Sequence, residues 1–204
     1  MTRTLRRWQV RSTLAILALS AVTTLVGILR PDHYRDLPDL AASYRVQDAT
    51  VLLLGVPVLA VGLLFATRGS LRGRIVWLSG LAFMTYIWAS VGLQVSFNET
   101  FLVYVALSTL SLFTLVGGVA GTDPEPVRDA LAGRISRRLY AGALAVIGVG
   151  LAALWLSEIV PALLAGTDPV LVQESGQTAL VSHFLDLAVV VPSLLLAAAW
   201  LLRD

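Results

Sequence analysis

Long apolar stretches alternate with short polar stretches along the whole chain. Each apolar stretch is close to the ~20 residues that an α-helix needs to cross the hydrocarbon core of a membrane. They cover residues 12–29, 46–67, 75–95, 100–120, 139–164 and 179–202. Segments of ~10 residues with alternating polarity, typical of membrane β-strands, do not occur. The pattern predicts an all-α, polytopic transmembrane bundle of six spans that forms a single domain over residues 1–204.

The composition excludes a soluble globular protein. Hydrophobic residues make up 57% of the chain and charged residues 14%, whereas an ordinary soluble domain carries about 25% charged residues. The chain has no Cys and no Lys, so disulfides, thiolate chemistry and a retinal Schiff base are excluded. The net charge is +2, and no basic run is interleaved with aromatic residues, so nucleic acid is not expected as a partner.

The Arg residues are distributed unevenly between the two sides of the predicted bundle. If the N-terminus is cytoplasmic, twelve of the fifteen Arg residues lie inside, and the other three are Arg30, Arg35 and Arg45. Because cytoplasmic segments carry the excess of basic residues, we predict a multi-pass protein of the cell membrane with both termini cytoplasmic. A cleaved signal peptide is the alternative for residues 12–29, but this stretch is longer than the 7–15 apolar residues of a signal sequence.

Residues 122–138 form a predicted amphipathic segment on the cytoplasmic side. Thr122 and Glu125 have the spacing of a capping box, and Val127 and Leu131 recur at helical spacing among Arg residues. Such a helix lies on the membrane surface, so membrane lipids are the expected partner. Small residues spaced four apart in the spans permit close helix packing, within the chain or in a homo-oligomer.

Ionisable residues inside membrane spans are costly and therefore mark functional sites. Here they gather on the predicted extracytoplasmic side: Asp48, Glu99, Glu158, His183 and Asp186. The inner halves of the spans contain no Asp, Glu or His. We therefore predict a polar, acidic pocket that opens to the extracytoplasmic side and binds or transports a small cation or polar solute. For Asp48, a simple N-cap of the second span is the alternative interpretation.

His183 and Asp186 are three residues apart and therefore share one face of the sixth span. Glu158, near the outer end of the fifth span, is their expected partner across the hairpin. The three residues are candidate catalytic groups, and a membrane-embedded hydrolase or lipid-modifying enzyme is the second functional hypothesis. In a third hypothesis the protein is a structural accessory subunit, in which Asp186 pairs with an Arg such as Arg45.

A metal site is a further hypothesis for the same side. His33 and Asp36 repeat the three-residue spacing, and together with Glu158, His183 and Asp186 they include ligands suited to Zn²⁺ or a similar divalent ion. The spacing of the five residues matches no diagnostic motif. A haem is not expected, because His183 is the one suitable axial ligand in the spans.

Four stretches carry a resemblance to known sequences. They are Tyr44-Arg45-Val46-Gln47-Asp48, Arg68-Gly69-Ser70-Leu71-Arg72-Gly73-Arg74, Phe101-Leu102-Val103-Tyr104-Val105-Ala106-Leu107 and His183-Phe184-Leu185-Asp186-Leu187. Together they resemble a group of prokaryotic multi-span membrane proteins with no assigned activity. The resemblance implies a self-contained membrane module and no catalytic role. The two halves of the chain share no residue pattern that would indicate an inverted repeat.

Overall fold

The computed structural model describes residues 5–131, 136–177 and 179–203, and every regular element in these ranges is a helix. Within them, six helical segments are long and apolar enough to cross a membrane: Arg7–Leu29, Pro38–Thr67, Leu71–Gln94, Phe101–Ala120, Arg137–Ala165 and Val181–Arg203. The predicted all-α fold, with six helices long and apolar enough to span a membrane, is thereby confirmed. The chain divides into two compact units, Met1–Asp129 and Ala130–Asp204, and each is described by itself.

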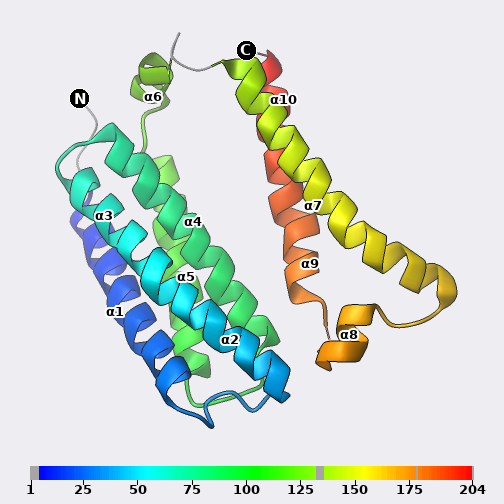
Figure 1. Cartoon of the computed structure of the whole chain (residues 1–204). Coiled ribbons are helices and arrows are strands. Elements are labelled where there is room, and N and C mark those ends of the chain that lie inside the picture. The colour runs from blue at the N-terminus through cyan, green and yellow to red at the C-terminus, as the bar shows by residue number, and fades with distance from the viewer. Residues whose placement is uncertain (1–4, 132–135, 178, 204) are drawn as a thin grey trace. The chain divides into compact units, whose positions relative to one another are not determined.

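Unit 1 is a bundle of four spans (Figure 1). Its elements are α1 (Arg7–Leu29), α2 (Pro38–Thr50), η1 (Val51–Gly55), α3 (Val56–Thr67), α4 (Leu71–Gln94) and α5 (Phe101–Ala120). The second span is one continuous helix, because α2, the π-helical segment η1 and α3 follow each other without a break. Around the bundle, α1 packs between α3 and α5, and α4 packs between the same two helices on the opposite side.

The second span begins earlier than the apolar pattern predicts, at Pro38 rather than near residue 46. Leu40, Tyr44 and Asp48 recur every four residues and are buried along one face of α2. Polar residues lie between them, so this buried face does not form an apolar run in the sequence. Asp48 therefore lies well inside a helix, and the interpretation of Asp48 as an N-cap is wrong.

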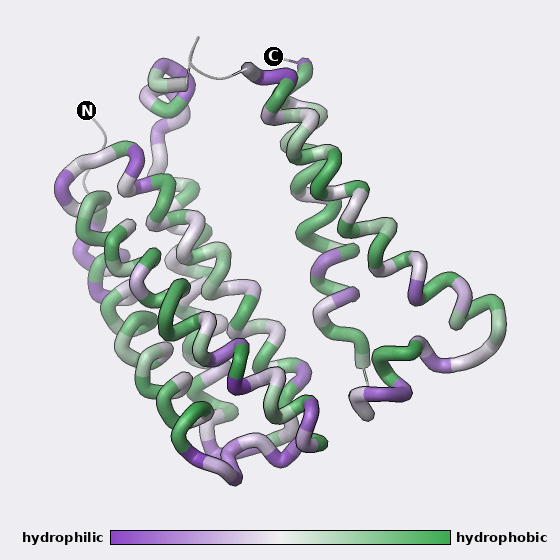
Figure 2. The backbone as a smooth tube through the Cα atoms, in the orientation of Figure 1, coloured by the Kyte–Doolittle hydropathy of each residue, from purple (hydrophilic) through white to green (hydrophobic). Residues whose placement is uncertain are grey.

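The core of unit 1 contains a line of small and polar side chains on α1. The buried positions are three or four residues apart: Gln9, Thr13, Ile16, Ser20, Thr23, Thr24 and Gly27. Two fully buried indoles of α4 cross the bundle to this line, since Trp77 Nε1 donates to Thr13 Oγ1 (3.0 Å) and Trp88 Nε1 donates to Ser20 Oγ (3.1 Å). Interhelical hydrogen bonds of this kind hold helices together where lipid offers no hydrophobic drive. Figure 2 shows the apolar length of these helices, with polar segments at their ends.

Arg74 closes the end of unit 1 at which α5 finishes. Its buried guanidinium donates from Nε to Thr122 Oγ1 (2.9 Å) and from Nη2 to the carbonyl of Gly121 (3.2 Å). The predicted Thr122–Glu125 box is not formed, because the Glu125 amide donates to Asp123 Oδ1 instead. The predicted amphipathic segment 122–138 contains α6 (Pro124–Leu131), and its residues 132–135 lie outside the described residues.

Unit 2 is a helical hairpin with a short helix in its connection. Its elements are α7 (Arg137–Ala165), α8 (Val170–Ser175), α9 (Val181–Leu185), η2 (Asp186–Val190) and α10 (Val191–Arg203). The short helix α8 begins directly after Asp168-Pro169, with Pro169 at its N-cap. Within the unit, α7 packs along α10 and η2, and three of the 29 residues of α7 are buried, Ala141, Gly148 and Ala162.

Candidate functional site

The candidate site lies where the connections 30–37 and 95–100 close unit 1. The side chains of Asp48, Tyr34, Tyr104, His33 and Glu99, called here the Asp48 cluster, come from both connections and from α2 and α5. Four of the five are buried, at 4% exposure for Asp48, 7% for Tyr34, 2% for Tyr104 and 0% for His33. Polar groups at this burial persist when they bond to one another, because an unpaired polar group in an apolar medium is costly.

The Asp48 carboxylate packs against α1 at Gly27, which has no side chain, and accepts a short hydrogen bond there. The hydroxyl of Tyr34 donates to Asp48 Oδ2 at 2.5 Å. A Cβ atom at Gly27 would overlap this carboxylate oxygen and would lie 2.8 Å from the Tyr34 hydroxyl. Gly27 therefore provides the space in α1 that the Asp48 carboxylate and its donor occupy.

His33 connects the two tyrosines to the surface. Its Nε2 lies 3.1 Å from the hydroxyl of Tyr104, and the Tyr104 hydroxyl in turn interacts electrostatically with that of Tyr34. Its Nδ1 lies 3.5 Å from Glu99 Oε1. The ring is fixed by an edge contact with Tyr34, with 4.8 Å between ring centroids. The result is a chain of polar contacts from Asp48 through Tyr34, Tyr104 and His33 to Glu99.

Glu99 forms the accessible end of this chain. Its side chain is 38% exposed and pairs with the guanidinium of Arg30, which is 60% exposed. Exposed ion pairs contribute little stability, so the pair serves mainly to position the Glu99 carboxylate beside His33. Nearby, the buried Asn98 donates to the Tyr104 hydroxyl at 3.4 Å and accepts from the amide and hydroxyl of Thr100.

Burial, hydrogen bonds and neighbouring charges shift the pKa values of His33, Tyr34 and Glu99, which lie in the two connections. Burial lowers the pKa of His33 below its ordinary value, against the opposing effect of Glu99. Burial, followed by the charge of Asp48, raises the pKa of Tyr34. A hydrogen bond with its own backbone, together with the charge of Arg30, lowers the pKa of Glu99. His33 is thus held neutral beside an ionised Glu99, and a neutral imidazole can accept a proton at one nitrogen and release one from the other.

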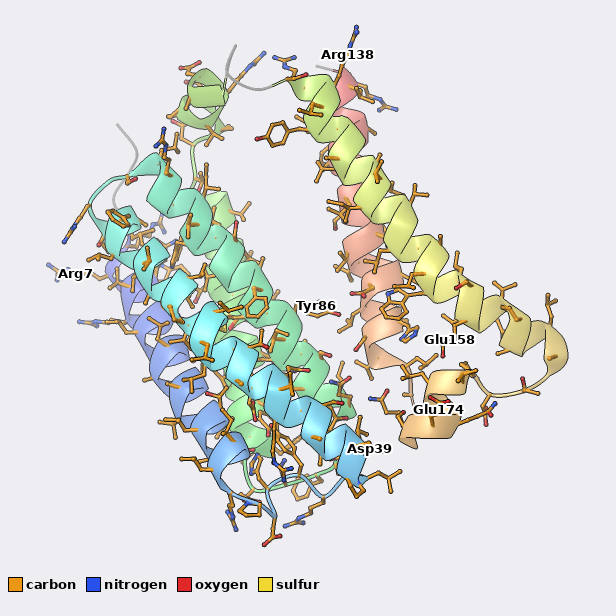
Figure 3. All side chains as sticks on the ribbon, in the orientation of Figure 1. Arg7, Asp39, Tyr86, Arg138, Glu158 and Glu174 are labelled. Carbon is orange, nitrogen blue, oxygen red and sulfur yellow. The ribbon has the colours of Figure 1, made fainter. Side chains whose placement is uncertain are left out.

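A second cluster of ionisable groups lies in unit 2, between α7 and α9. His183 is 2% exposed, and its Nε2 lies 3.4 Å from Glu158 Oε2. The other Glu158 oxygen accepts from the Leu171 amide of α8 at 2.8 Å. Trp155 Nε1 donates to Asp186 Oδ2 at 2.9 Å, and its ring lies 3.8 Å from that of His183. Figure 3 labels Glu158 on α7 and the neighbouring Glu174 on α8.

The five predicted pocket residues fall into two sets, two residues in unit 1 and three in unit 2. Asp48 and Glu99 are the two ends of the Asp48 cluster in unit 1. Glu158, His183 and Asp186 lie together in unit 2, and the predicted approach of Glu158 to His183 across the hairpin is observed. Arg45, proposed from the sequence as a partner of Asp186, donates to the carbonyl of Pro31 at 2.7 Å.

His33 and Asp36 do not converge as their spacing suggested. Asp36 accepts from the amide and hydroxyl of Ser96, whereas His33 points to Tyr104 and Glu99. Residues 31–37 are not helical, so side chains three apart do not share a face there. Among the described residues, no group of three or more His, Cys, Asp or Glu side chains is arranged to hold a metal ion.

Sequence reasoning missed three residues of the Asp48 cluster and its surroundings. Tyr104 resembles any aromatic residue near a membrane interface, and Tyr34 lies in a polar loop, so neither pattern indicates a buried hydroxyl. Gly27 is an isolated glycine in an apolar helix, which often marks a close approach of another group. The four-residue recurrence of Leu40, Tyr44 and Asp48 was the available sign that Asp48 faces the interior.

No protein-family model, curated protein or solved structure matches this chain. The resemblance to the prokaryotic membrane proteins remains a prediction, and the fold and the two clusters carry the functional argument.

Proposed function

We propose that this membrane protein takes up a proton at Asp48 from the extracytoplasmic side, through a relay formed by Glu99, His33, Tyr104 and Tyr34. The observation that carries the proposal is the row of polar side chains between the buried Asp48 carboxylate and the exposed Glu99 carboxylate, in which Tyr34 contacts Asp48 and His33 contacts both Tyr104 and Glu99. The proton is the smallest member of the predicted ligand class, a small cation or polar solute.

The burial of the relay favours a proton over a larger ligand. Tyr34, Tyr104 and His33 are packed with little or no exposed surface. A solute or hydrated ion would need an open path past these side chains. A proton needs no such path, because it can pass between neighbouring hydroxyl and imidazole groups. Asp48 also accepts a hydrogen bond from Tyr34, whereas a metal ion such as Ca²⁺ requires 6–8 oxygen ligands.

Each link of the relay can pass a proton without leaving a charge behind. A proton that reaches Glu99 moves to Nδ1 of His33, and the proton on Nε2 moves to the Tyr104 hydroxyl. Tyr104 passes its own proton to Tyr34, and Tyr34 passes its own to Asp48 Oδ2. The lowered pKa of His33 supports this sequence, because a permanently charged imidazolium would have no free nitrogen to accept the next proton.

The direction of access follows from the predicted topology. The excess of Arg on the termini and on the segments 68–74 and 122–138 predicts that these parts face the cytoplasm. The connections that carry His33 and Glu99 then face the extracytoplasmic side. The hypothesis of an enzyme based on His183 and Asp186 has no observation in its favour beyond their proximity to Glu158.

Infrared difference spectroscopy of the purified protein between neutral and mildly acidic pH tests the proposal. We expect a band of a protonated carboxyl group that is lost in Asp48→Asn and kept in Asp39→Asn. Asp39 is an exposed acid on the same helix (Figure 3) and is therefore the matched control. Adding Na⁺ or K⁺ at constant pH should leave the band unchanged. Identical spectra for Asp48→Asn and the wild type would overturn the proposal.

A further inference from the structure

One helix in each unit contains a π-helical segment, and the two segments are built in the same way. In each, a five-residue π-helical segment is followed by Val-Pro: η1 by Val56-Pro57 and η2 by Val191-Pro192. In each, the amide of that Val donates to the carbonyl five residues before it. The following Pro has no amide hydrogen, so the regular helical ladder cannot continue there, and the wider turn accommodates the break.

Aligning the two prolines places Asp48 and His183 at the same position, nine residues before each Pro. Both are buried in their own units. Each lies close to a carboxylate or hydroxyl group from a neighbouring element, Tyr34 for Asp48 and Glu158 for His183. The repeated device therefore presents an ionisable side chain at an equivalent position of each of these helices.

His183 has a carboxylate beside one ring nitrogen and an unpartnered second nitrogen. Its Nδ1 is buried and has no hydrogen-bond partner among the described residues, so the lone pair of this nitrogen is open to a proton while Nε2 faces Glu158. Unpaired buried nitrogens are uncommon in folded proteins and call for an explanation. The indole of Trp155 covers the ring, with 3.8 Å between centroids.

The charges near His183 are acidic. Glu158 faces it from α7, and Asp186 follows one turn later on its own helix. From α8 the contact is the Leu171 amide, which donates to Glu158. The basic residues among the described part of unit 2 lie at the start of α7 and the end of α10: Arg137, Arg138 and Arg203. A positive charge on His183 would thus be balanced by carboxylates of its own unit.

We propose that His183 and Glu158 form a second proton-binding site, located in unit 2. A proton adds to the free ring nitrogen of the neutral imidazole, and the resulting imidazolium is stabilised by the Glu158 carboxylate. The Leu171 amide holds that carboxylate in place from its other oxygen. This site shares no residue with the Asp48 relay, so either proposal can fail without the other.

The sequence offers a direct test, because the chain has two histidines. The full-length protein labelled with ¹⁵N-histidine should give two imidazole signals in detergent micelles, which His33→Gln and His183→Gln assign. We expect the His183 signal to titrate reversibly between the neutral and the charged form. Glu158→Gln should move its midpoint to lower pH by about one unit, the effect of losing a nearby opposite charge. The His33 midpoint should not move.

Glu174→Gln is the matched control, since Glu174 is an exposed acid on α8 and should leave both midpoints unchanged. A His183 signal that stays in the neutral form from about pH 5 to pH 9 would overturn the proposal without any variant. Equal shifts of the His183 midpoint in Glu158→Gln and Glu174→Gln would also overturn the proposal. If Glu158→Gln does not fold, Glu158→Asp tests the same dependence with a shorter carboxylate, and an unchanged midpoint would contradict the proposal.

Discussion

The two units bury an ionisable group at the same position of a π-helix-containing span, but they surround it differently. In unit 1, α2–η1–α3 packs against α1 and α4, and both Asp48 and its partner Tyr34 are buried. In unit 2, α9–η2–α10 packs against α7, and His183 is buried while the side chain of its partner Glu158 remains 24% exposed. The π-helical segment and the Pro that follows it therefore mark where the ionisable group lies along the helix. The neighbouring helices decide how far its polar partner is buried with it.

The largest expected difference between the units is in the loss of thermal stability when a glycine of the first helix is replaced by alanine. Gly27→Ala inserts a methyl group into the space occupied by the Asp48 carboxylate and the Tyr34 hydroxyl. Overpacking of this kind costs about 1–3 kcal/mol, so the thermal unfolding midpoint in detergent should fall clearly. Gly150→Ala is the control, because nothing lies within 4 Å of a Cβ atom at Gly150. Equal midpoints for the two variants would contradict the close packing of α1 against Asp48.

The indoles of the two units should differ in their contribution to stability. Trp88→Phe removes a donor to Ser20 in a fully buried core and should cost about 1–2 kcal/mol. Trp155→Phe removes the donor to Asp186, but at a partly exposed position, where we expect a cost below about 1 kcal/mol. Chemical unfolding of both variants in one detergent provides the comparison. A larger loss for Trp155→Phe would reverse the conclusion drawn from burial.

The pH dependence of stability should be the smallest effect, and it should come from unit 1. Because burial lowers the pKa of His33 below its ordinary 6.5, the folded protein binds fewer protons than the unfolded chain in this range. The contribution of His33 to stability is then complete above pH 6.5 and declines as the pH falls from there toward the lowered pKa. The unfolding midpoint of the wild type should therefore fall relative to that of His33→Gln on acidification, since proton uptake at Asp48 acts in both proteins.

The titration of Glu99 does not interfere with the comparison of His33→Gln and the wild type. Its pKa is lowered from an ordinary value of 4.5, so its contribution is lost in a more acidic range. Equal declines for His33→Gln and the wild type between pH 7.5 and pH 5.5 would show that His33 is not kept neutral by the fold.

The spans could be predicted from the sequence, whereas the Asp48 cluster could be predicted only in part. Apolar runs determine membrane spans because lipid accepts no unpaired backbone groups, so six helices followed directly from the pattern. The pairing of Glu158 with His183 was also predictable, since both lie near one end of a short hairpin. The approach of His33 to Tyr104 joins residues 71 positions apart, and no local spacing encodes such a contact. The start of the second span was missed because its buried face alternates with polar residues.

The most direct test of the account follows the protonation of Asp48 in time. The protein is reconstituted in liposomes, the pH outside the predicted extracytoplasmic face is dropped, and the carboxyl band assigned to Asp48 is recorded by time-resolved infrared spectroscopy. The account predicts that the band follows the pH on that face. In Tyr34→Phe, which lacks the hydroxyl next to Asp48, the band should appear at least about tenfold more slowly, the lower end of the effect of losing a positioned proton-transfer group. A band that follows the pH of the opposite face, or that appears equally fast in Tyr34→Phe, would contradict the relay.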